Sequence, residues 1–258
     1  MKTHPPCWLI NAAKWVKSSM ESALLLFVRK LLRVKTTTLP HAVNVSNATY
    51  SPWLGDAAFE EVLMAVKHHT TLDVYRLHEL WSLIEQLKDI PGDILEVGVY
   101  KGGSGALLAE KCRRENITCT LHLCDTFKGV VKARQHDNKY KGGEFSDTSA
   151  GLVRDLLKRM QLDNATIYEG IFPDEVAARI PDVSFRLCHI DVDTYESARQ
   201  VTEWIWPKLS QGGAVVYDDY GFVGCEGVTK FVNQIKSDKD KLFIHNLNGH
   251  ALVFKVGS

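Results

Sequence analysis

Four aspartates stand where two apolar, strand-like runs of the sequence end. Asp191 and Asp193 follow the first run, and Asp218 and Asp219 follow the second. If the runs are neighbouring parallel strands, about 4.8 Å apart, the four carboxylates lie within reach of one ion. Asp191 and Asp193 are two apart, so an extended chain would point both to one side. Clustered acids need a cation or shared protons, and oxygen ligands favour Mg²⁺ first, with Mn²⁺ or Ca²⁺ as alternatives.

Each aspartate also has a simpler explanation as a helix cap or turn residue. Asp193 could cap a helix that begins near Tyr195, and Asp219 could open a turn. A cap is the better explanation for one aspartate alone. Four acids at two adjacent strand ends favour a metal site instead, and calorimetry with Mg²⁺ separates the two, because caps predict no binding.

A glycine-rich turn lies between another strand-like run and a helix start, where backbone can approach a cofactor closely. The dinucleotide pattern GxGxxG is absent, because the next glycine after Gly98 is Gly102. Gly98 and Gly103 have the spacing of a phosphate-binding loop, but Ser104 and Gly105 follow where a lysine and a serine or threonine are required. The turn is therefore not a triphosphate site, and its glycines alone leave a cofactor role open.

Two further acids lie near the ends of strand-like runs. Asp125 ends the strand after the glycine turn, a place that suits a carboxylate accepting hydrogen bonds from a ribose diol; a helix or turn cap is the alternative. Glu96 lies in the strand before the turn, where its carboxylate needs a cationic or donor partner.

Strand-like and helix-like runs alternate along the body of the chain. Strands are expected at 93–98, 119–124, 165–169, 184–191, 214–218, 242–247 and 251–256. Helices are expected at 56–69, 73–87, 103–115, 149–160, 173–180, 195–209 and 227–237. This alternation predicts an α/β fold with a mostly parallel sheet covered on both faces.

The last two strands are separated by only Asn248, Gly249 and His250. Such a connection is too short for a parallel crossover, so these strands must form an antiparallel hairpin. Seven strands ending in this way resemble the Rossmann-like class I S-adenosylmethionine methyltransferase fold. Residues 128–148 show no periodicity, and we expect them to form a lid, because methyl transfer from a sulfonium gains from water exclusion.

Length and composition favour one catalytic domain with an N-terminal extension. The chain has 258 residues, 45% of them apolar, and a formal net charge of zero, which gives no field that favours nucleic acid. We assign residues 1–55 to an arm and linker and residues 56–258 to the domain. Six scattered cysteines without metal-ligand spacing predict reduced, mostly buried thiols and a cytoplasmic protein.

The N-terminal arm, residues 1–35, carries seven Lys or Arg residues against one acid, with apolar residues between them. It has no uncharged run long enough to span a membrane and no clear signal-peptide core. A packing or dimerisation arm is the favoured explanation, and a basic amphipathic helix on a membrane surface is the alternative.

Six motifs, found in one order between residues 71 and 256, resemble those of the macrocin O-methyltransferase family. The motifs are Glu96-Val-Gly-Val-Tyr-Lys-Gly-Gly103, Asp125-Thr-Phe-Lys-Gly129, Phe145-Ser-Asp-Thr-Ser149, Tyr168-Glu-Gly-Ile-Phe-Pro-Asp174, Asp191-Val-Asp-Thr-Tyr-Glu-Ser197 and Asp218-Asp-Tyr-Gly221. Enzymes of that family depend on Mg²⁺ and S-adenosylmethionine, so the resemblance implies both cofactors here.

The resemblance also implies a role for each candidate residue. Asp191, Asp218 and Asp219 would bind Mg²⁺, and Asp193 would act as general base. The implied S-adenosylmethionine site is Glu96, Gly98, Gly102, Gly103, Ser104 and Asp125, with Gly170 and Ile171 near the adenine.

The implied reaction is methyl transfer to a hydroxyl, one of a neighbouring pair, on a small molecule such as a sugar or natural product. The metal would lower the pKa of that hydroxyl and Asp193 would take its proton. Departures from the family at Tyr100-Lys101, at Ile171 and over residues 1–35 leave the substrate more open than the chemistry.

Two other classes of function stay open from the sequence. A metal-dependent hydrolase could use the same acids but would leave Asp125 and the glycine turn without a role. A non-catalytic, membrane-associated binding protein would rest on the N-terminal arm, and a homo-oligomer is compatible with either class. The histidines, including His122, His189 and His250, have no evident partner at ligand spacing, so we expect them to be ordinary core or surface groups.

Overall fold

The computed structural model describes residues 34–35, 40–41, 50–246 and 248–257. The chain divides into two units, Met1–Pro52 and Trp53–Ser258. Described residues of the first unit form a short antiparallel pair, β1 (Val34–Lys35) and β2 (Pro40–His41). The arm predicted at residues 1–35 lies almost wholly outside the described residues. Among those described, no helix has the length and apolar character to cross a membrane.

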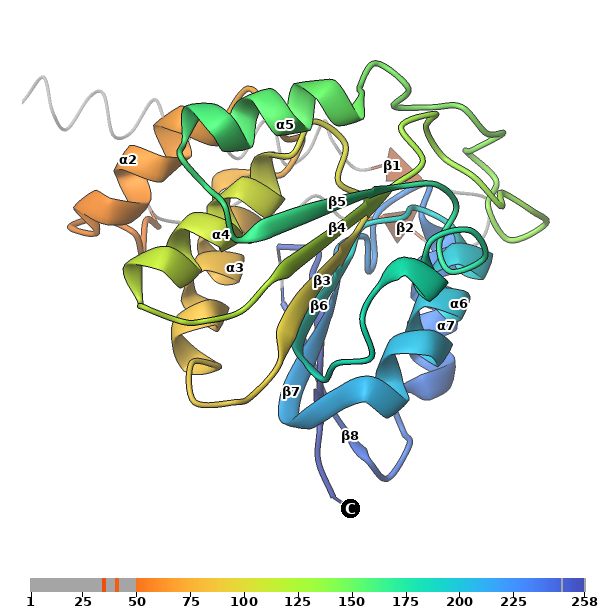
Figure 1. Cartoon of the computed structure of the whole chain (residues 1–258). Coiled ribbons are helices and arrows are strands. Elements are labelled where there is room, and N and C mark those ends of the chain that lie inside the picture. The colour runs from red at the N-terminus through yellow and green to blue at the C-terminus, as the bar shows by residue number, and fades with distance from the viewer. Residues whose placement is uncertain (1–33, 36–39, 42–49, 247, 258) are drawn as a thin grey trace, which may run out of the picture. The chain divides into compact units, whose positions relative to one another are not determined.

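A seven-stranded sheet forms the centre of the second unit (Figure 1). Its strands are β3 (Asp93–Val97), β4 (Leu121–Asp125), β5 (Ala165–Glu169), β6 (Phe185–Ile190), β7 (Leu209–Tyr217), β8 (Lys241–His245) and β9 (Ala251–Lys255). Their order is β5-β4-β3-β6-β7-β9-β8. The strands from β5 to β7 are parallel, whereas β9 runs antiparallel to both β7 and β8. The predicted α/β sheet with a closing hairpin is confirmed.

Over the described residues, six α-helices accompany the sheet. They are α2 (Ala57–Val66), α3 (Val74–Gln86), α4 (Gly103–Arg114), α5 (Ala150–Arg159), α6 (Tyr195–Ile205) and α7 (Glu226–Ile235). Asp56 caps α2 by accepting a hydrogen bond from the Phe59 amide, and Asp73 caps α3 in the same way. These caps fix where the first two helices of the unit begin, as the sequence predicted.

Two predicted helices are wrong in extent. Residues 173–180 form only a 3₁₀ turn, Ala177–Arg179, and Pro181 disfavours helical geometry at Ile180. The helix that begins at Tyr195 ends at Ile205 rather than 209. Pro207 follows in a 3₁₀ turn, and β7 then begins at Leu209, five residues before the predicted start at 214.

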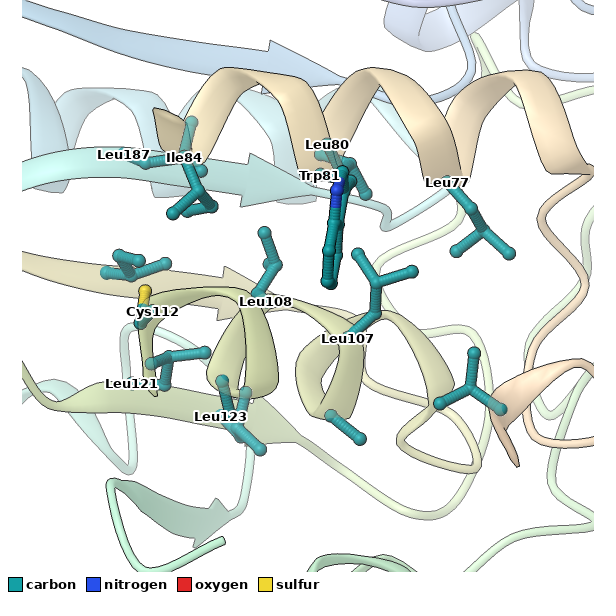
Figure 2. Close-up of a cluster of buried hydrophobic side chains, with 14 of the residues drawn as sticks. Leu77, Leu80, Trp81, Ile84, Leu107, Leu108, Cys112, Leu121, Leu123 and Leu187 are labelled. Carbon is teal, nitrogen blue, oxygen red and sulfur yellow. The ribbon is translucent and has the colours of Figure 1, made fainter. Parts of the chain in front are cut away.

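The sheet separates two hydrophobic clusters. On one face, α3, α4 and α5 pack over alternate strand residues, with α2 against α3 and α4; on the other face, α6 and α7 pack against the residues between them (Figure 1). Figure 2 shows the first cluster, where Leu77, Trp81 and Ile84 of α3 lie over Leu107 and Leu108 of α4. Both faces of the strands are therefore buried, which explains their nearly continuous apolar runs.

The order in which strands are added to the sheet reverses at β3, which has β4 on one side and β6 on the other. Ligands of open α/β sheets bind at the carboxyl ends of strands beside such a switch point. Gly98, just after β3, has a φ of +94°, and a Cβ there would lie 1.7 Å from the Asp191 carbonyl oxygen. Only glycine lets the loops after β3 and β6 approach so closely.

Candidate active site

A cavity of about 260 Å³ opens at this edge of the sheet. All five parallel strands contribute to it through the residues that follow them or end them. These include Gly98, Tyr100, Asp125, Gly170, Phe172, Asp191, Asp193, Asp218 and Asp219. The four aspartates after β6 and β7, together with Asp125 and part of the predicted cofactor loop, therefore line one cavity.

The acids divide into two overlapping groups. Asp191, Asp218 and Asp219 each offer a carboxylate oxygen, and these atoms lie within 4.8 Å of one another. They meet because β6 and β7 are adjacent and in register, with Ile190 opposite Tyr217. Asp193 lies instead with Asp219 and Cys225. The expected proximity of the acids is thus confirmed, with Asp193 set apart from the trio.

The expectation that an extended chain points Asp191 and Asp193 to one side is wrong. The strand ends at Ile190, and Asp193 has a φ of +61°, so the chain is not extended there. The turn into α6 directs Asp193 into the cavity, where its Oδ1 lies 3.7 Å from the Cys225 Sγ. Asp193 does not cap α6 either, because Thr194 holds the cap position.

Burial and like charge act together on the trio. Burial first, and then the neighbouring Asp218 carboxylate, raise the pKa of Asp191 and of Asp219 well above the usual range. The Asp219 Oδ2 is buried and has no hydrogen-bond partner among the described residues. Three convergent carboxylates with one unpaired oxygen fit a hard divalent cation, which would compensate their charge.

Asp218 differs from its neighbours because Arg76, His189 and His250 surround it. Burial works to raise its pKa, but His189, His250 and Arg76 outweigh burial and hold that pKa well below the usual range. The His250 Nε2 lies 2.8 Å from Asp218 Oδ1, and the Arg76 Nη1 contacts Oδ2. Each carboxylate oxygen has two lone-pair sites, so both oxygens can still accept a metal.

His189 and His250, the two histidines beside Asp218, are buried core groups, as expected, but the prediction that they lack partners at the site is wrong. The His189 Nδ1 on β6 is hydrogen-bonded to the Glu96 Oε1 on β3, at 2.9 Å. His250 is bonded through its Nδ1 to Glu79 of α3. Burial lowers the pKa of His189, yet the Asp218 and Glu96 carboxylates raise it to about 10.

Arg76 was missed by the sequence reasoning. It lines the cavity, its Nε lies 2.9 Å from Asp73 Oδ2, and its guanidinium stands 5.2 Å from the centre of the Phe222 ring. A signal was available, because Arg76 precedes Leu80 and Leu83 at helical spacing on the apolar face of α3. A charged residue in that stripe indicates a buried partner.

Asp125 braces the glycine turn. Its Oδ2 accepts hydrogen bonds from the backbone amides of Val99 and Tyr100, at 2.7 and 2.8 Å, and its Oδ1 accepts one from Phe127 at 2.6 Å. Three of the roughly four lone-pair sites of the carboxylate are therefore occupied. One further donor, rather than both hydroxyls of a ribose, fits the remaining site, so the ribose role stays a prediction in this narrower form.

The other predicted cofactor residues shape the loop from behind the cavity. Glu96 is fully buried, and its partner is His189 rather than a group in the cavity. Gly102 caps α4 in the left-handed conformation, and Gly103 and Ser104 are buried in the first turn of that helix. Ile171 also lies outside the cavity lining, next to Gly170, which lies within it. Their contacts with S-adenosylmethionine stay predictions.

The loop between β4 and α5 has no helix or strand, as predicted for residues 128–148. Lys139, Tyr140 and Phe145 of this loop line the cavity. Tyr140 is 6% exposed; burial, and next its hydrogen bond to Asp193, raise the pKa of its hydroxyl. The loop therefore covers the acids, whereas its opening and closing stay predictions.

All five cysteines of the described part of the chain are free thiols, and four of these, Cys112, Cys124, Cys188 and Cys225, are buried. The predicted burial is therefore confirmed for these four, whereas the reduced state stays a prediction. The sixth, Cys7, lies outside the described residues.

Comparison with known proteins identifies relatives of this chain. Residues 57–248 match the family described as "Macrocin-O-methyltransferase (TylF)". The 8-demethyl-8-(2,3-dimethoxy-alpha-L-rhamnosyl)-tetracenomycin-C 4'-O-methyltransferase of Streptomyces olivaceus is 30% identical over 61% of this chain and 64% of its own. The mycinamicin III 3''-O-methyltransferase of Micromonospora griseorubida is also 30% identical, over 61% of this chain and 67% of its own. The alignments thus cover about two thirds of either relative.

Solved structures agree on the fold. The O-methyltransferase NovP matches 74% of this chain and 83% of its own length with a TM-score of 0.66 and 23% identity. The calicheamicin methyltransferase CalS11 matches 84% of this chain and all of its own length, with a TM-score of 0.61 and 18% identity.

Proposed function

Because the chain belongs to the macrocin O-methyltransferase (TylF) family, we propose that it transfers a methyl group from S-adenosylmethionine to a hydroxyl of a small molecule. One observation carries the proposal. The acids after β6 and β7 face the glycine turn after β3 across a single cavity at the switch point of the sheet. A methyl donor and an acceptor hydroxyl can therefore meet beside a general base.

The acceptor in this proposal is a sugar or a glycosylated natural product. The relatives are named for O-methylation of a rhamnosyl-tetracenomycin and of mycinamicin III. The cavity combines acids with the aromatic side chains of Tyr100, Tyr140, Phe145 and Phe222, a lining that suits a ring carrying hydroxyl groups.

Asp193 acts as the general base in this proposal. It lines the cavity, and burial raises the pKa of its carboxyl, which brings the group closer to the pH at which proton transfer is efficient. The Cys225 Sγ lies 3.7 Å from its Oδ1, and the Tyr140 hydroxyl lies 3.6 Å from the same sulfur. General base catalysis of this kind contributes roughly 10²- to 10⁴-fold to the rate.

Asp191, Asp218 and Asp219 hold Mg²⁺ in this proposal. A bound Mg²⁺ supplies positive charge that lowers the pKa of an acceptor hydroxyl and orients it. The unpaired Asp219 Oδ2 and the raised pKa values of Asp191 and Asp219 support this ligand set. A vicinal pair of hydroxyls is the acceptor geometry that such an ion would select.

The cofactor lies in this proposal along the glycine turn. Gly98 and Gly170 line the cavity, and the remaining lone-pair site of Asp125 accepts one ribose hydroxyl. Phe172 lies beside Gly170 and supplies an apolar wall.

The test combines ligand binding with turnover. We expect the full chain to bind S-adenosylhomocysteine in calorimetry and to methylate glycosylated acceptors in the presence of Mg²⁺, as measured by mass spectrometry. Asp193→Asn should lower turnover by at least roughly 100-fold and leave the affinity for S-adenosylhomocysteine unchanged. Asp182→Asn is the matched control, because Asp182 is an exposed acid paired with Lys208.

Absence of S-adenosylhomocysteine binding would contradict the proposed activity as a whole and favour the metal-dependent hydrolase. Binding with full turnover in Asp193→Asn would remove only Asp193 from the role of base.

A further inference from the structure

Two histidines and one aspartate converge just behind the cavity. His189 comes from β6, Asp218 follows β7, and His250 precedes β9. Each of them offers one ligand atom, and these three atoms lie within 4.8 Å of one another. The two histidine nitrogens lie 3.8 and 2.8 Å from the Asp218 oxygen, respectively. All three residues are buried, with at most 1% exposed.

The Nδ1 atom of each histidine is hydrogen-bonded to a glutamate. The His189 Nδ1 is bonded to Glu96, and the His250 Nδ1 is bonded to Glu79. Metal-binding histidines typically donate the other ring N–H to a carboxylate, which fixes the tautomer and aims the second nitrogen at the ion. Both rings here have that arrangement, with Nε2 directed at the same aspartate.

The His189 Nε2 is the atom that this arrangement leaves unexplained. It has no hydrogen-bond partner among the described residues, because 3.8 Å exceeds hydrogen-bond distance to Asp218. An unpaired polar atom in a fully buried residue is costly, so native structures seldom retain one without a ligand, an ion or a water.

We propose that His189, Asp218 and His250 form a second cation site, for a divalent ion of borderline softness, Zn²⁺ first. Two imidazoles and one carboxylate match the ligand preference of Zn²⁺, whereas Mg²⁺ prefers oxygen alone. Ligands about 2.1 Å from a tetrahedral Zn²⁺ are roughly 3.4 Å apart, between the two nitrogen–oxygen distances observed.

This site is distinct from the Asp191, Asp218 and Asp219 trio and shares only Asp218 with it. It does not depend on methyl transfer. The competing account is a buried ion pair, in which a protonated His189 lies between Glu96 and Asp218. Zn²⁺ would replace that proton, because only the neutral ring binds a metal.

The first experiment uses the wild-type full chain, stripped with a chelator and titrated with Zn²⁺ and with Co²⁺ in the presence of excess Mg²⁺. We expect one tightly bound Zn²⁺ per chain and a Co²⁺ complex whose visible absorption is that of a nitrogen-ligated ion of low coordination number. X-ray absorption at the zinc edge should show two imidazole ligands. An oxygen-only ligand shell, or no binding, would overturn the proposal without any variant.

Variants then locate the ion. Glu79→Gln removes the carboxylate that orients His250 and should weaken Zn²⁺ binding by roughly 10- to 100-fold. His250→Asn removes a ligand itself and should weaken Zn²⁺ binding by more than that. His245→Asn is the matched control, because His245 is an exposed histidine of the same hairpin. Its affinity should equal that of wild type. Thermal melts in chelator verify that each variant is folded.

Asp219→Asn separates this site from the other candidates. It disrupts both the oxygen trio and the group of Asp193, Asp219 and Cys225, but not the histidine site. We expect it to retain Zn²⁺ and to lose Mg²⁺ affinity. Loss of Zn²⁺ in Asp219→Asn, with retention in His250→Asn, would place the ion at the cysteine group and contradict the proposal. The binding of S-adenosylhomocysteine by the same samples reports separately on the proposed function.

Discussion

At the scale of single residues, Asp218 is the carboxylate on which the site is built. Arg76 contacts one of its oxygens and His250 the other, while the adjacent Asp219 has an oxygen without a partner. Two neighbouring aspartates in one sequence motif therefore have opposite environments. Arg76 and His250 keep Asp218 ionised, whereas the unpaired oxygen of Asp219 needs a partner from a ligand in the cavity.

Arg76 provides a direct test of that difference. Its side chain and that of Asp218 are 11% and 2% exposed, and removing one partner of a buried ion pair costs roughly 3–5 kcal/mol. We expect Arg76→Gln to lose about this much free energy of unfolding in chelator and distinctly less in Mg²⁺, because the ion replaces the missing positive charge. Urea denaturation with and without Mg²⁺ measures both values. Arg154→Gln, on the exposed face of α5, is the control and should change the free energy of unfolding in neither condition. Equal losses for Arg76→Gln in chelator and in Mg²⁺ would count against a metal site beside Asp218.

Tyr140 links the covering loop to the proposed base. Its hydroxyl lies 3.6 Å from the Cys225 Sγ, and the Asp193 carboxylate is close enough to help raise the pKa of that hydroxyl. A hydrogen bond to a charged group contributes about 1.5–3 kcal/mol, so Tyr140→Phe should lower kcat by roughly 10- to 100-fold. The affinity for S-adenosylhomocysteine should stay unchanged. Tyr195→Phe is the control, because its hydroxyl bonds Gln234 on the surface; an equal effect of both variants would show that Tyr140 does not act through Asp193.

At the scale of elements, the site depends on how closely the loop after β3 passes the end of β6. Gly98 and Gly143 both have a positive φ, of +94° and +90°, but only Gly98 is crowded. A Cβ at Gly98 would lie 1.7 Å from the Asp191 carbonyl oxygen, whereas nothing lies within 4 Å at Gly143. The pair therefore separates the cost of backbone conformation from the cost of lost space.

We expect Gly143→Ala to cost only about 1–2 kcal/mol, the price of a left-handed conformation. Gly98→Ala should cost more than about 4 kcal/mol, because the two loops must also move apart. Urea denaturation monitored by circular dichroism measures both. Similar losses for the two variants would mean that β3 and β6 do not require this close approach.

At the scale of the whole molecule, the unit from Trp53 onward brings a surplus of negative charge to one edge of its sheet. Burial and the neighbouring carboxylate raise the pKa of Asp191 and of Asp219 above their ordinary value of 3.8. In the absence of a metal, the folded protein therefore retains protons that the unfolded chain has already lost. These two groups then make the folded state less stable as pH rises above 3.8.

Mg²⁺ should reverse that loss, so the rise in Tm caused by Mg²⁺ should be larger at pH 8 than at pH 6. Asp218 does not obscure the effect. Its lowered pKa adds stability that is lost only as pH falls below its ordinary range. Differential scanning fluorimetry with Mg²⁺ and with chelator gives the comparison. In Asp219→Asn the pH dependence should shrink, and a Mg²⁺ effect that is constant with pH in wild type would argue against shared protons in the acid trio.

The sequence by itself determined the architecture of the domain and the place of its acids. Alternating runs gave the strands and most of the helices, and Asp56 and Asp73 marked two helix starts, because these signals lie within a few residues of one another. The proximity of Asp191 to Asp218 also followed from the sequence. Parallel strands end at one edge, so residues just after two neighbouring strands must lie close together.

Only the tertiary structure decided what surrounds those acids. Arg76 and Asp218 are 142 residues apart, and Glu79 and His250 are 171 apart, so no local pattern could pair them. The left-handed turn at Asp193 and the three amides on Asp125 likewise depend on loops that pack against one another. Periodicity reports which face of an element is buried, whereas charge partners are chosen by the way distant elements pack.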